Sequence, residues 1–304
     1  MQTGKLDRLS CSRGTAVTAV EYRLSSFMIQ TPSERIDETH RDFVAALARG
    51  LSVIQAFSEN QPEMTLSEVA QAAQMNVATA RRALLTLHSL GYVGMQGKRF
   101  LLLPKVLSLG VAYLRSMNFK DLVNPYLQEV ADEYRDSVSF AVLDGDDVVY
   151  LAHVPSKRSI TRRASVGYRL PAFCTSLGRI LLANQSIEEQ QRLLARAPFP
   201  QYTAKTVVQR DDLAREFAKA LTDGFATQQD EIEMGVVSIA LPVCDPQGNV
   251  IAAINCSSET DRTTNEDLIA TRLPALREAR AHIEWALRRA PALVHSIRSS
   301  WRAT

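Results

Sequence analysis

The sequence predicts an α+β protein with two domains, a winged helix-turn-helix followed by a larger domain built on antiparallel strands. Three observations support this prediction. The chain has 304 residues, which is enough for about two domains of ordinary size. Helix, helix, turn, helix and hairpin patterns follow one another between residues 42 and 103. Farther along, paired strand patterns alternate with helical segments, as expected where helices pack around an antiparallel sheet.

The winged helix-turn-helix is expected over residues 41–103. A first helix is predicted from apolar residues at helical spacing, namely Val44, Leu47, Leu51 and Ile54. A second helix begins at Thr65, whose side chain can form a capping box with Glu68. A third helix begins after Asn76, a good N-cap residue, and ends before Gly91, which suits a left-handed C-cap.

The segment that follows, YVGMQGKRFLLL, has two short apolar runs around Gly94 and Gly97, which indicates a hairpin. This hairpin would be the wing of the domain. From Pro104 onward, KVLSLGVAYLRS predicts a linker helix, and residues 104–120 are assigned to the linker.

The second domain is expected over residues 121–292. Helices are predicted in DLVNPYLQEVADEYRD, TSLGRILLANQSIEEQQRLLARA and DDLAREFAKALTDG, and a long closing helix has Pro274 at a start or kink. Strand pairs are predicted in SFAVLDGDDVVYLAHV and VVSIALPVCDPQGNVIAAINCSS. Residues 1–40 show no sustained periodicity and are expected to form a flexible extension, with Met28 as an alternative start of the chain. Residues 293–304 are expected to form a C-terminal tail.

Composition and cysteine usage exclude several classes of protein. The chain is 46% hydrophobic and 22% charged, as globular proteins are, and its net charge of +2 indicates little by itself. The cysteines are Cys11, Cys174, Cys244 and Cys256. They form no CxxC pair and no cluster with histidines, so we expect no structural zinc and no disulfide framework. No metal site and no cofactor are expected. Free cysteines, no signal-peptide core and no apolar run of about 20 residues indicate a cytoplasmic protein without a membrane segment.

The distribution of charge indicates a nucleic-acid partner. No Asp or Glu occurs between Glu68 and Asp121. The same interval contains the basic residues Arg81, Arg82, Lys98, Arg99, Lys105, Arg115 and Lys120. In a chain of nearly balanced charge, this asymmetry is expected of a surface that faces DNA phosphates.

The third predicted helix has the properties of a recognition helix. The residues expected to contact DNA are Val77, Ala78, Thr79, Arg81 and Arg82 on its first turns, and Lys98 and Arg99 on the wing. Small residues permit close approach to the groove, and arginine offers a planar fork for guanine or phosphate. The alternative is that these arginines only solvate a helix and that the winged domain contacts another protein.

Several motifs in order resemble one known family. LSEVAQAAQMNVATARRALLTLHSLGYV, then TSLGRILLA, then DEIEMGVVSIALPVCDPQGNVIAAINCSS are similar to the IclR family of bacterial transcriptional regulators, over residues 43–290. VGYRLPAFCTSLGRILLA most resembles the PcaR, PobR and PcaU branch, which regulates aromatic-acid catabolism through protocatechuate and β-ketoadipate. The resemblance implies a GAF-like effector-binding domain, a homodimer or homotetramer on inverted-repeat double-stranded operator DNA, and a small organic acid as effector.

The resemblance also implies which residues hold the effector. They are Ser176 and Leu177, through backbone amides at a helix start, with Gln228, Val236, Ser238, Asn255 and Ser257. Family members often have a cysteine in place of Ser238 and an acid in place of Gln228, and some have a serine in place of Asn255. Arg162 and Arg163 precede the Ser176 loop, and either could pair with a carboxylate or be a solvated surface residue.

An enzyme is the rival class of protein. Cys174 and His153 could form a nucleophile and base, but nothing in the sequence places them within reach of one another. The chain has no P-loop, GxSxG, HExxH or helix-opening GxGxxG motif. We therefore expect a ligand-responsive transcriptional regulator. An interaction protein that does not read DNA, or an enzyme acting on a small carboxylate, are the alternatives.

Overall fold

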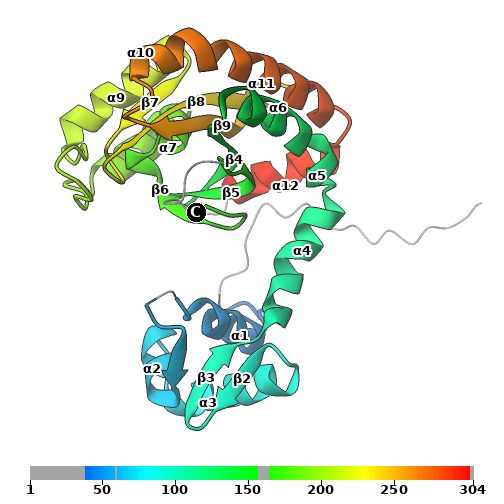
Figure 1. Cartoon of the computed structure of the whole chain (residues 1–304). Helices are drawn as coiled ribbons and strands as arrows, with labels where there is room; N and C mark the ends of the chain where they lie inside the picture. The colour runs from blue at the N-terminus through cyan, green and yellow to red at the C-terminus, as the bar shows by residue number, and fades with distance from the viewer. Residues whose placement is uncertain (1–37, 59, 157–163, 302–304) are drawn as a thin grey trace, which may run out of the picture. The chain divides into compact units, whose positions relative to one another are not determined.

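The computed structural model describes residues 38–58, 60–156 and 164–301. Most of the predicted N-terminal extension, including Met28, lies outside the described residues, as do Arg162 and Arg163. The chain divides into two units, residues 1–86 and 87–304. This division falls inside the third helix of the predicted winged domain, earlier than the predicted boundary at residue 103. Figure 1 draws the described residues in colour.

The first unit contains the helices predicted for the helix-turn-helix. Its elements are α1 (Ala45–Gln55), β1 (Glu63–Thr65), α2 (Leu66–Ala72) and the larger part of α3 (Val77–Ser89). The capping box of α2 is confirmed, because Thr65 N donates to Glu68 Oε2 at 2.7 Å and Glu68 N to Thr65 Oγ1 at 3.4 Å. The N-cap of α3 is also confirmed, since Asn76 Oδ1 accepts from Thr79 N at 2.9 Å.

The apolar periodicity of α1 predicts the helix but not its buried side. Val44 is 63% exposed, Leu47 64% and Leu51 46%, whereas Val53 is fully buried. Helices normally bury their apolar stripe against a partner. The periodic residues of α1 therefore form an apolar surface that this chain does not itself cover among the described residues.

The second unit begins with the end of α3 and the predicted wing. Strands β2 (Val93–Gln96) and β3 (Arg99–Leu102) pair antiparallel, and the strand order of the small sheet is β1-β3-β2. Of the two glycines expected in the hairpin, only Gly97 forms the turn, with φ +61°. Gly94 instead lies inside β2, where an added Cβ would come within 2.9 Å of the Leu103 side chain. The linker region contains a 3₁₀ turn (Pro104–Val106) and α4 (Leu107–Ser116).

A six-stranded antiparallel sheet forms the centre of the C-terminal region. Its strand order is β6-β5-β4-β9-β8-β7. The strands are β4 (Ser137–Asp144), β5 (Asp147–Val154), β6 (Arg169–Pro171), β7 (Ala226–Gln229), β8 (Val236–Cys244) and β9 (Val250–Glu259). The two predicted strand pairs are confirmed as β4–β5 and β8–β9. The short edge strands β6 and β7 were not predicted.

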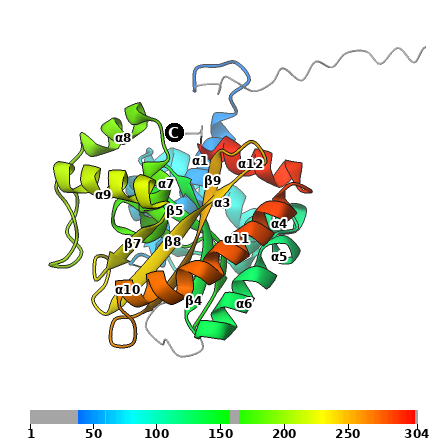
Figure 2. The same cartoon turned by 90° about the horizontal axis from the view of Figure 1, so that it is seen from above.

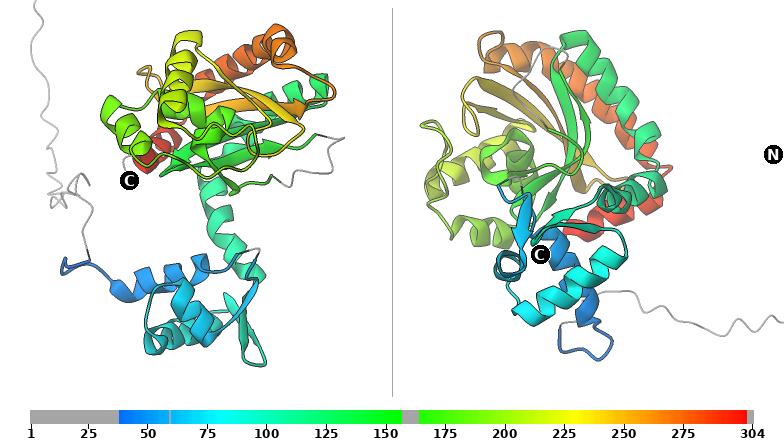
Figure 3. Two further views of the ribbon diagram at one scale, coloured as in Figure 1. Left: turned by 90° about the vertical axis from the view of Figure 1, so that its left-hand side faces the viewer. Right: turned by 60° about the horizontal axis from the view of Figure 1, so that its bottom comes forward.

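Helices cover both faces of this sheet. One face packs against α5 (Phe119–Leu122), α6 (Asn124–Tyr134), α11 (Leu273–Leu287) and α12 (Pro291–Trp301). The other packs against α7 (Ser176–Ala183), α8 (Ile187–Leu194) and α9 (Arg210–Asp223). Figure 2 shows these two helical layers on opposite sides of the strands, and in Figure 3 α6 lies beside α11 although they are far apart in the sequence. A 3₁₀ turn (Ala172–Cys174) precedes α7, and α10 (Asn265–Asp267) and a π-helical turn (Leu268–Arg272) precede α11.

Three helical predictions need correction. The segment expected as one helix from residue 175 to residue 197 is two, because Ser186 caps a new helix by accepting from Glu189 N. The helix expected near Asp121 is divided into α5 and α6, with a proline in the first turn of α6. The expected tail is helical up to Trp301, because Leu293 and Ile297 are one turn apart and bury against the sheet.

Pro274 is confirmed at the start of α11. None of the helices among the described residues has the length and apolar character that a bilayer span requires.

Candidate effector site and DNA-contact residues

One half of the sheet face beneath α7 is polar. Ser139 pairs across the strands with His153 on β5 and with Asn255 on β9. Ser257 pairs with Ser137 on one side and with Ser238 on the other, and Ser238 pairs with Gln228. Residues opposite one another in antiparallel strands point to the same face of the sheet. Side chains from β5, β4, β9, β8 and β7 therefore form one continuous polar surface, which we call the polar face.

Hydrogen bonds join these side chains in pairs. Ser139 Oγ lies 2.9 Å from His153 Nδ1, and Asn255 Nδ2 donates to Ser257 Oγ at 3.0 Å. The Oδ1 atom of Asn255 is buried and has no hydrogen-bond partner among the described residues. A buried acceptor of this kind is costly unless a ligand or water satisfies it. The polar face thus contains groups suited to bind a polar molecule.

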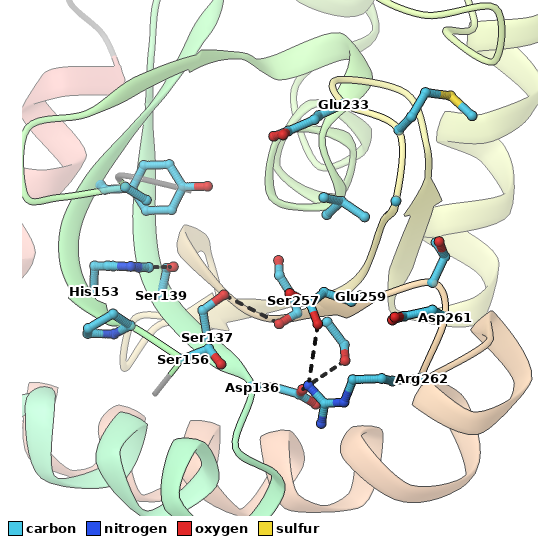
Figure 4. Close-up of a pocket in the computed structure, with 18 residues that line it drawn as sticks. Asp136, Ser137, Ser139, His153, Ser156, Glu233, Ser257, Glu259, Asp261 and Arg262 are labelled. Atoms are coloured by element: carbon cyan, nitrogen blue, oxygen red, sulfur yellow. Dashed lines mark hydrogen bonds and ion pairs between the residues drawn. The ribbon is translucent and has the colours of Figure 1, made fainter. Parts of the chain in front are cut away.

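A cavity of about 350 Å³ opens over part of the polar face (Figure 4). Its polar and charged lining comprises Asp136, Ser137, Ser139, Tyr150, His153, Ser156, Glu233, Ser257, Ser258, Glu259, Thr260, Asp261 and Arg262. The remaining lining residues are Pro155, Ala164, Met234, Gly235 and Val236. This volume lies in the range of small-molecule sites.

The structure brings only some of the predicted effector-binding residues into this cavity. Val236 and Ser257 line it. The others that the structure describes, Ser176, Leu177, Gln228, Ser238 and Asn255, are buried and are not part of its lining. Asn255 nevertheless hydrogen-bonds Ser257, so the two sets of residues adjoin.

The TSLG motif positions α7 against the sheet. Ser176 and Leu177 are the first two residues of α7, as predicted, and each is 1% exposed. Thr175 caps the helix by accepting from Gly178 N at 3.0 Å. Ser176 Oγ lies 2.8 Å from Ser238 Oγ, which ties the helix start to β8. The amides at the start of α7 are therefore covered by protein rather than open to the cavity.

Sequence reasoning missed most of the residues that line the cavity. Ser137 and Ser139 on β4 alternate as Asn255 and Ser257 do on β9, so both pairs point to one face. Two polar residues at alternate positions of an otherwise apolar strand were the available signal. No such signal marked Asp136 and Arg262 as cavity residues, because their place in the lining depends on how distant segments of the chain pack.

The structure does not support the nucleophile and base of the enzyme alternative. Burial in an apolar cluster raises the pKa of the Cys174 thiol to about 12, and its Sγ donates to the Pro171 carbonyl. Burial lowers the pKa of His153, whose hydrogen bond goes to Ser139. A thiol of this pKa is almost entirely protonated near neutral pH and is a poor nucleophile. Within the described part of the chain, no group of His, Cys, Asp and Glu residues could hold a metal ion.

The predicted DNA-contact residues are accessible. On α3, Val77, Ala78, Arg81 and Arg82 are exposed and Thr79 is partly exposed, while the helix buries Ala80, Leu84 and Leu87. The two sides of this helix thus differ as expected for a recognition helix, with small and basic residues outward and apolar residues inward. Lys98 lies in the turn of the β2–β3 hairpin and Arg99 is the first residue of β3, and both are exposed.

Together, a winged helix-turn-helix and a separate domain with a ligand-sized polar cavity define the class of ligand-responsive DNA-binding regulators. Comparison with family models agrees. Residues 46–96 match the IclR helix-turn-helix domain, and residues 111–285 match the C-terminal domain of bacterial transcriptional regulators of the IclR type. The chain belongs to the IclR family and is a DNA-binding transcriptional regulator with an effector-binding domain.

Individual relatives cover most of the chain. It is 38% identical over 252 residues to the Pca regulon regulatory protein of Pseudomonas putida, covering 82% of this chain and 87% of the relative. It is 30% identical over 241 residues to the p-hydroxybenzoate hydroxylase transcriptional activator of Acinetobacter baylyi, covering 78% and 89%. It also resembles the crystal structure of an IclR homolog from Microbacterium hydrocarbonoxydans complexed with 4-hydroxybenzoate, with a TM-score of 0.67, 25% identity, and coverage of 80% and 99%.

Proposed function

We propose that this regulator senses a small aromatic acid, or a related acid of the β-ketoadipate pathway, in the cavity over the polar face. The observation that carries the proposal is the cavity of about 350 Å³ with serine hydroxyls from two strands on its floor. One relative is a p-hydroxybenzoate hydroxylase transcriptional activator, and one similar structure is complexed with 4-hydroxybenzoate. A planar ring with polar substituents suits a pocket of this size with a few placed polar groups.

The ligand would contact Ser137, Ser139 and Ser257 directly. The predicted contacts to Ser176 and Ser238 require their mutual hydrogen bond to open, since neither residue lines the cavity. Arg162 and Arg163 stay candidate partners of a carboxylate.

DNA recognition is proposed through α3, with Arg81 and Arg82 meeting bases or phosphates in the major groove. Lys98 and Arg99 of the wing would contact phosphates beside it. Because a bacterial regulator must reach the chromosome, we propose that the protein is cytoplasmic. We also propose that it has no catalytic activity.

We also propose that the protein is a homodimer or homotetramer. Support comes from the exposed apolar residues Leu47 and Leu51 of α1 and its N-cap Val44. Separate support comes from Leu107 and Val111, which are exposed one turn apart on α4. Exposed apolar faces of this kind are typical of association surfaces. A ligand would change operator affinity by favouring one arrangement of the paired effector domains, with α4 as the connection to the DNA-binding domain.

The test is a gel shift on the DNA that flanks the gene of this protein, with and without protocatechuate, 4-hydroxybenzoate and β-ketoadipate. A discrete shift that one acid alters supports both the operator and the effector class. A shift that no acid alters keeps the regulator and refutes the aromatic branch. No shift on any fragment at moderate salt would refute the proposed recognition of this flanking DNA.

A further inference from the structure

We propose that Arg262 is the residue that binds the carboxylate of the effector, and that the Ser139–His153 pair receives a hydroxyl group at the far side of the ligand. This inference rests on the proposed function, because it assumes that the cavity takes a small acid. It adds which residue supplies the charge and which way the ligand points.

The charges around the cavity restrict where an anion can bind. The carboxylates of the described lining are Asp136, Glu233, Glu259 and Asp261, and Arg262 is the one lysine or arginine of that lining. Like charges at short range repel strongly in a partly buried site. An acid that entered the described cavity would therefore be bound most favourably beside Arg262.

The guanidinium of Arg262 has N–H donors available to bind a ligand. Its Nη1 atom lies 3.6 Å from Asp136 Oδ1 and 4.0 Å from Glu259 Oε2, and both distances are longer than a hydrogen bond. No side-chain hydrogen bond from Arg262 to another described residue accompanies these two ion pairs. The side chain is 27% exposed, and an arginine fork matches the two oxygens of a carboxylate.

Arg262 can turn to a ligand without leaving Asp136 unpaired. The buried Asp136 accepts from Ser258 Oγ at 2.7 Å and from Arg272 Nε at 3.1 Å. Removing the sole partner of a buried charge would be strongly unfavourable, but here Arg272 remains. The long contact to Arg262 is thus the part of this network that is free to change.

The alternative binding site for a carboxylate is the start of α7, which the family resemblance suggests. Ser176 and Leu177 there are 1% exposed and outside the cavity lining, and Ser176 is bonded to Ser238. Arg262, by contrast, already borders the cavity.

The two ends of the cavity differ in chemistry. Figure 4 shows Arg262 with Asp136 on one side, His153 with Ser139 on the other, and Ser137 and Ser257 between them. Because burial keeps His153 largely neutral, its end offers uncharged donors and acceptors. The ligand this arrangement fits is an acid that carries a hydroxyl group across the ring from its carboxylate.

The experiment compares 4-hydroxybenzoate with its neutral analogue 4-hydroxybenzamide by calorimetric titration of the full chain. The wild type should prefer the acid. In Arg262→Gln, affinity for the acid should fall about tenfold to a hundredfold, as for loss of a charge-assisted hydrogen bond, while affinity for the amide stays nearly constant. Arg215→Gln is the matched control, because Arg215 is an exposed arginine paired with Asp212 on α9.

A second variant does not disturb Asp136. Glu259→Gln removes a carboxylate that competes for Arg262, so it should strengthen binding of the acid and leave the amide unchanged. This variant keeps the proposal testable even if Arg262→Gln folds poorly, which a melting curve would show.

The outcomes separate the two proposals. If the wild type binds neither compound, the aromatic effector class fails and this inference fails with it. If the wild type binds the acid, and Arg262→Gln keeps the same preference for acid over amide, sensing stands and Arg262 is refuted. A loss of that preference in the double variant Arg162→Gln/Arg163→Gln, and not in Arg262→Gln, would refute it as well.

Discussion

Gly178 fixes how closely α7 can approach the turn before it. A Cβ added at this position would lie 2.0 Å from the Ala172 carbonyl oxygen and 2.3 Å from its Cα, both backbone atoms that cannot move aside. We expect Gly178→Ala to lower the free energy of unfolding by about 3 kcal/mol, the upper part of the range for overpacking. Both tryptophans, Trp285 and Trp301, belong to the C-terminal region, so denaturant unfolding followed by their fluorescence measures the effect where it occurs.

Gly110 provides the control for this substitution. It lies in α4, and nothing stands within 4 Å of a Cβ added there. Because alanine is the better helix former, Gly110→Ala should leave the fluorescence transition unchanged or stabilise α4 slightly. Equal effects of the two substitutions would show that close approach at Gly178 is not what matters.

His153 should make stability depend on pH. Burial lowers its pKa below the ordinary value of 6.5, so the unfolded chain takes up a proton at a higher pH than the folded protein does. The stabilisation is therefore complete above pH 6.5, and it is lost as the pH falls from 6.5 to the folded pKa, by at most about 1.4 kcal/mol per pH unit. His153→Gln should remove this component, measured as unfolding free energies of both proteins between pH 7.5 and 5. An imidazole resonance of His153 that titrates at or above 6.5 in the folded protein would contradict the prediction.

At the scale of elements, α3 combines two functions in one helix. Ala80 and Leu84 are fully buried, whereas Arg81 and Arg82 between them are exposed. Substituting both arginines by alanine should therefore weaken DNA binding without unfolding the domain. If both contact phosphates, the slope of log affinity against log salt should become shallower by about 2.

Anisotropy titrations of labelled operator DNA at several salt concentrations measure both quantities. Arg215→Ala on α9 serves as the control for loss of an exposed arginine elsewhere. Unchanged affinity and slope in Arg81→Ala/Arg82→Ala would mean that α3 is not the recognition helix.

Elements with local signals were predictable, and elements that depend on their neighbours were not. The capping box of Thr65 and Glu68 and the N-cap Asn76 mark helix starts because each bond joins residues three apart. The strands β6 and β7 have three and four residues, too few for a periodic pattern, and form by pairing with longer strands. The break at Ser186 carried a capping signal, SIEE, but continuous apolar spacing on both sides obscured it.

At the scale of the whole molecule, the sequence was enough to predict the family, DNA binding and effector binding. It was not enough to predict which residues line the cavity. The motif of α3 and the motif of α7 are each one unbroken stretch of sequence, so each can be recognised from the sequence alone. Asp136, His153 and Arg262 line one cavity only because β5, the start of β4 and the segment that follows β9 are brought together by the fold. A site assembled from such distant segments leaves no spacing pattern to recognise.

The coupling between the cavity and the operator leads to a quantitative prediction. If 4-hydroxybenzoate changes the affinity for operator DNA by some factor, operator DNA must change the affinity for 4-hydroxybenzoate by the same factor, because both follow from one coupling free energy. Factors of about 5 to 150 are typical of such coupling. The first factor is measured by DNA anisotropy with and without saturating acid, and the second by calorimetric titration of the acid with and without bound DNA. A factor other than one requires that the acid bind with different affinity to the DNA-bound and the free protein, whatever the sign of regulation. If the acid alters DNA binding but binds the free and the DNA-bound protein with equal affinity, it acts by some route other than equilibrium binding to this cavity.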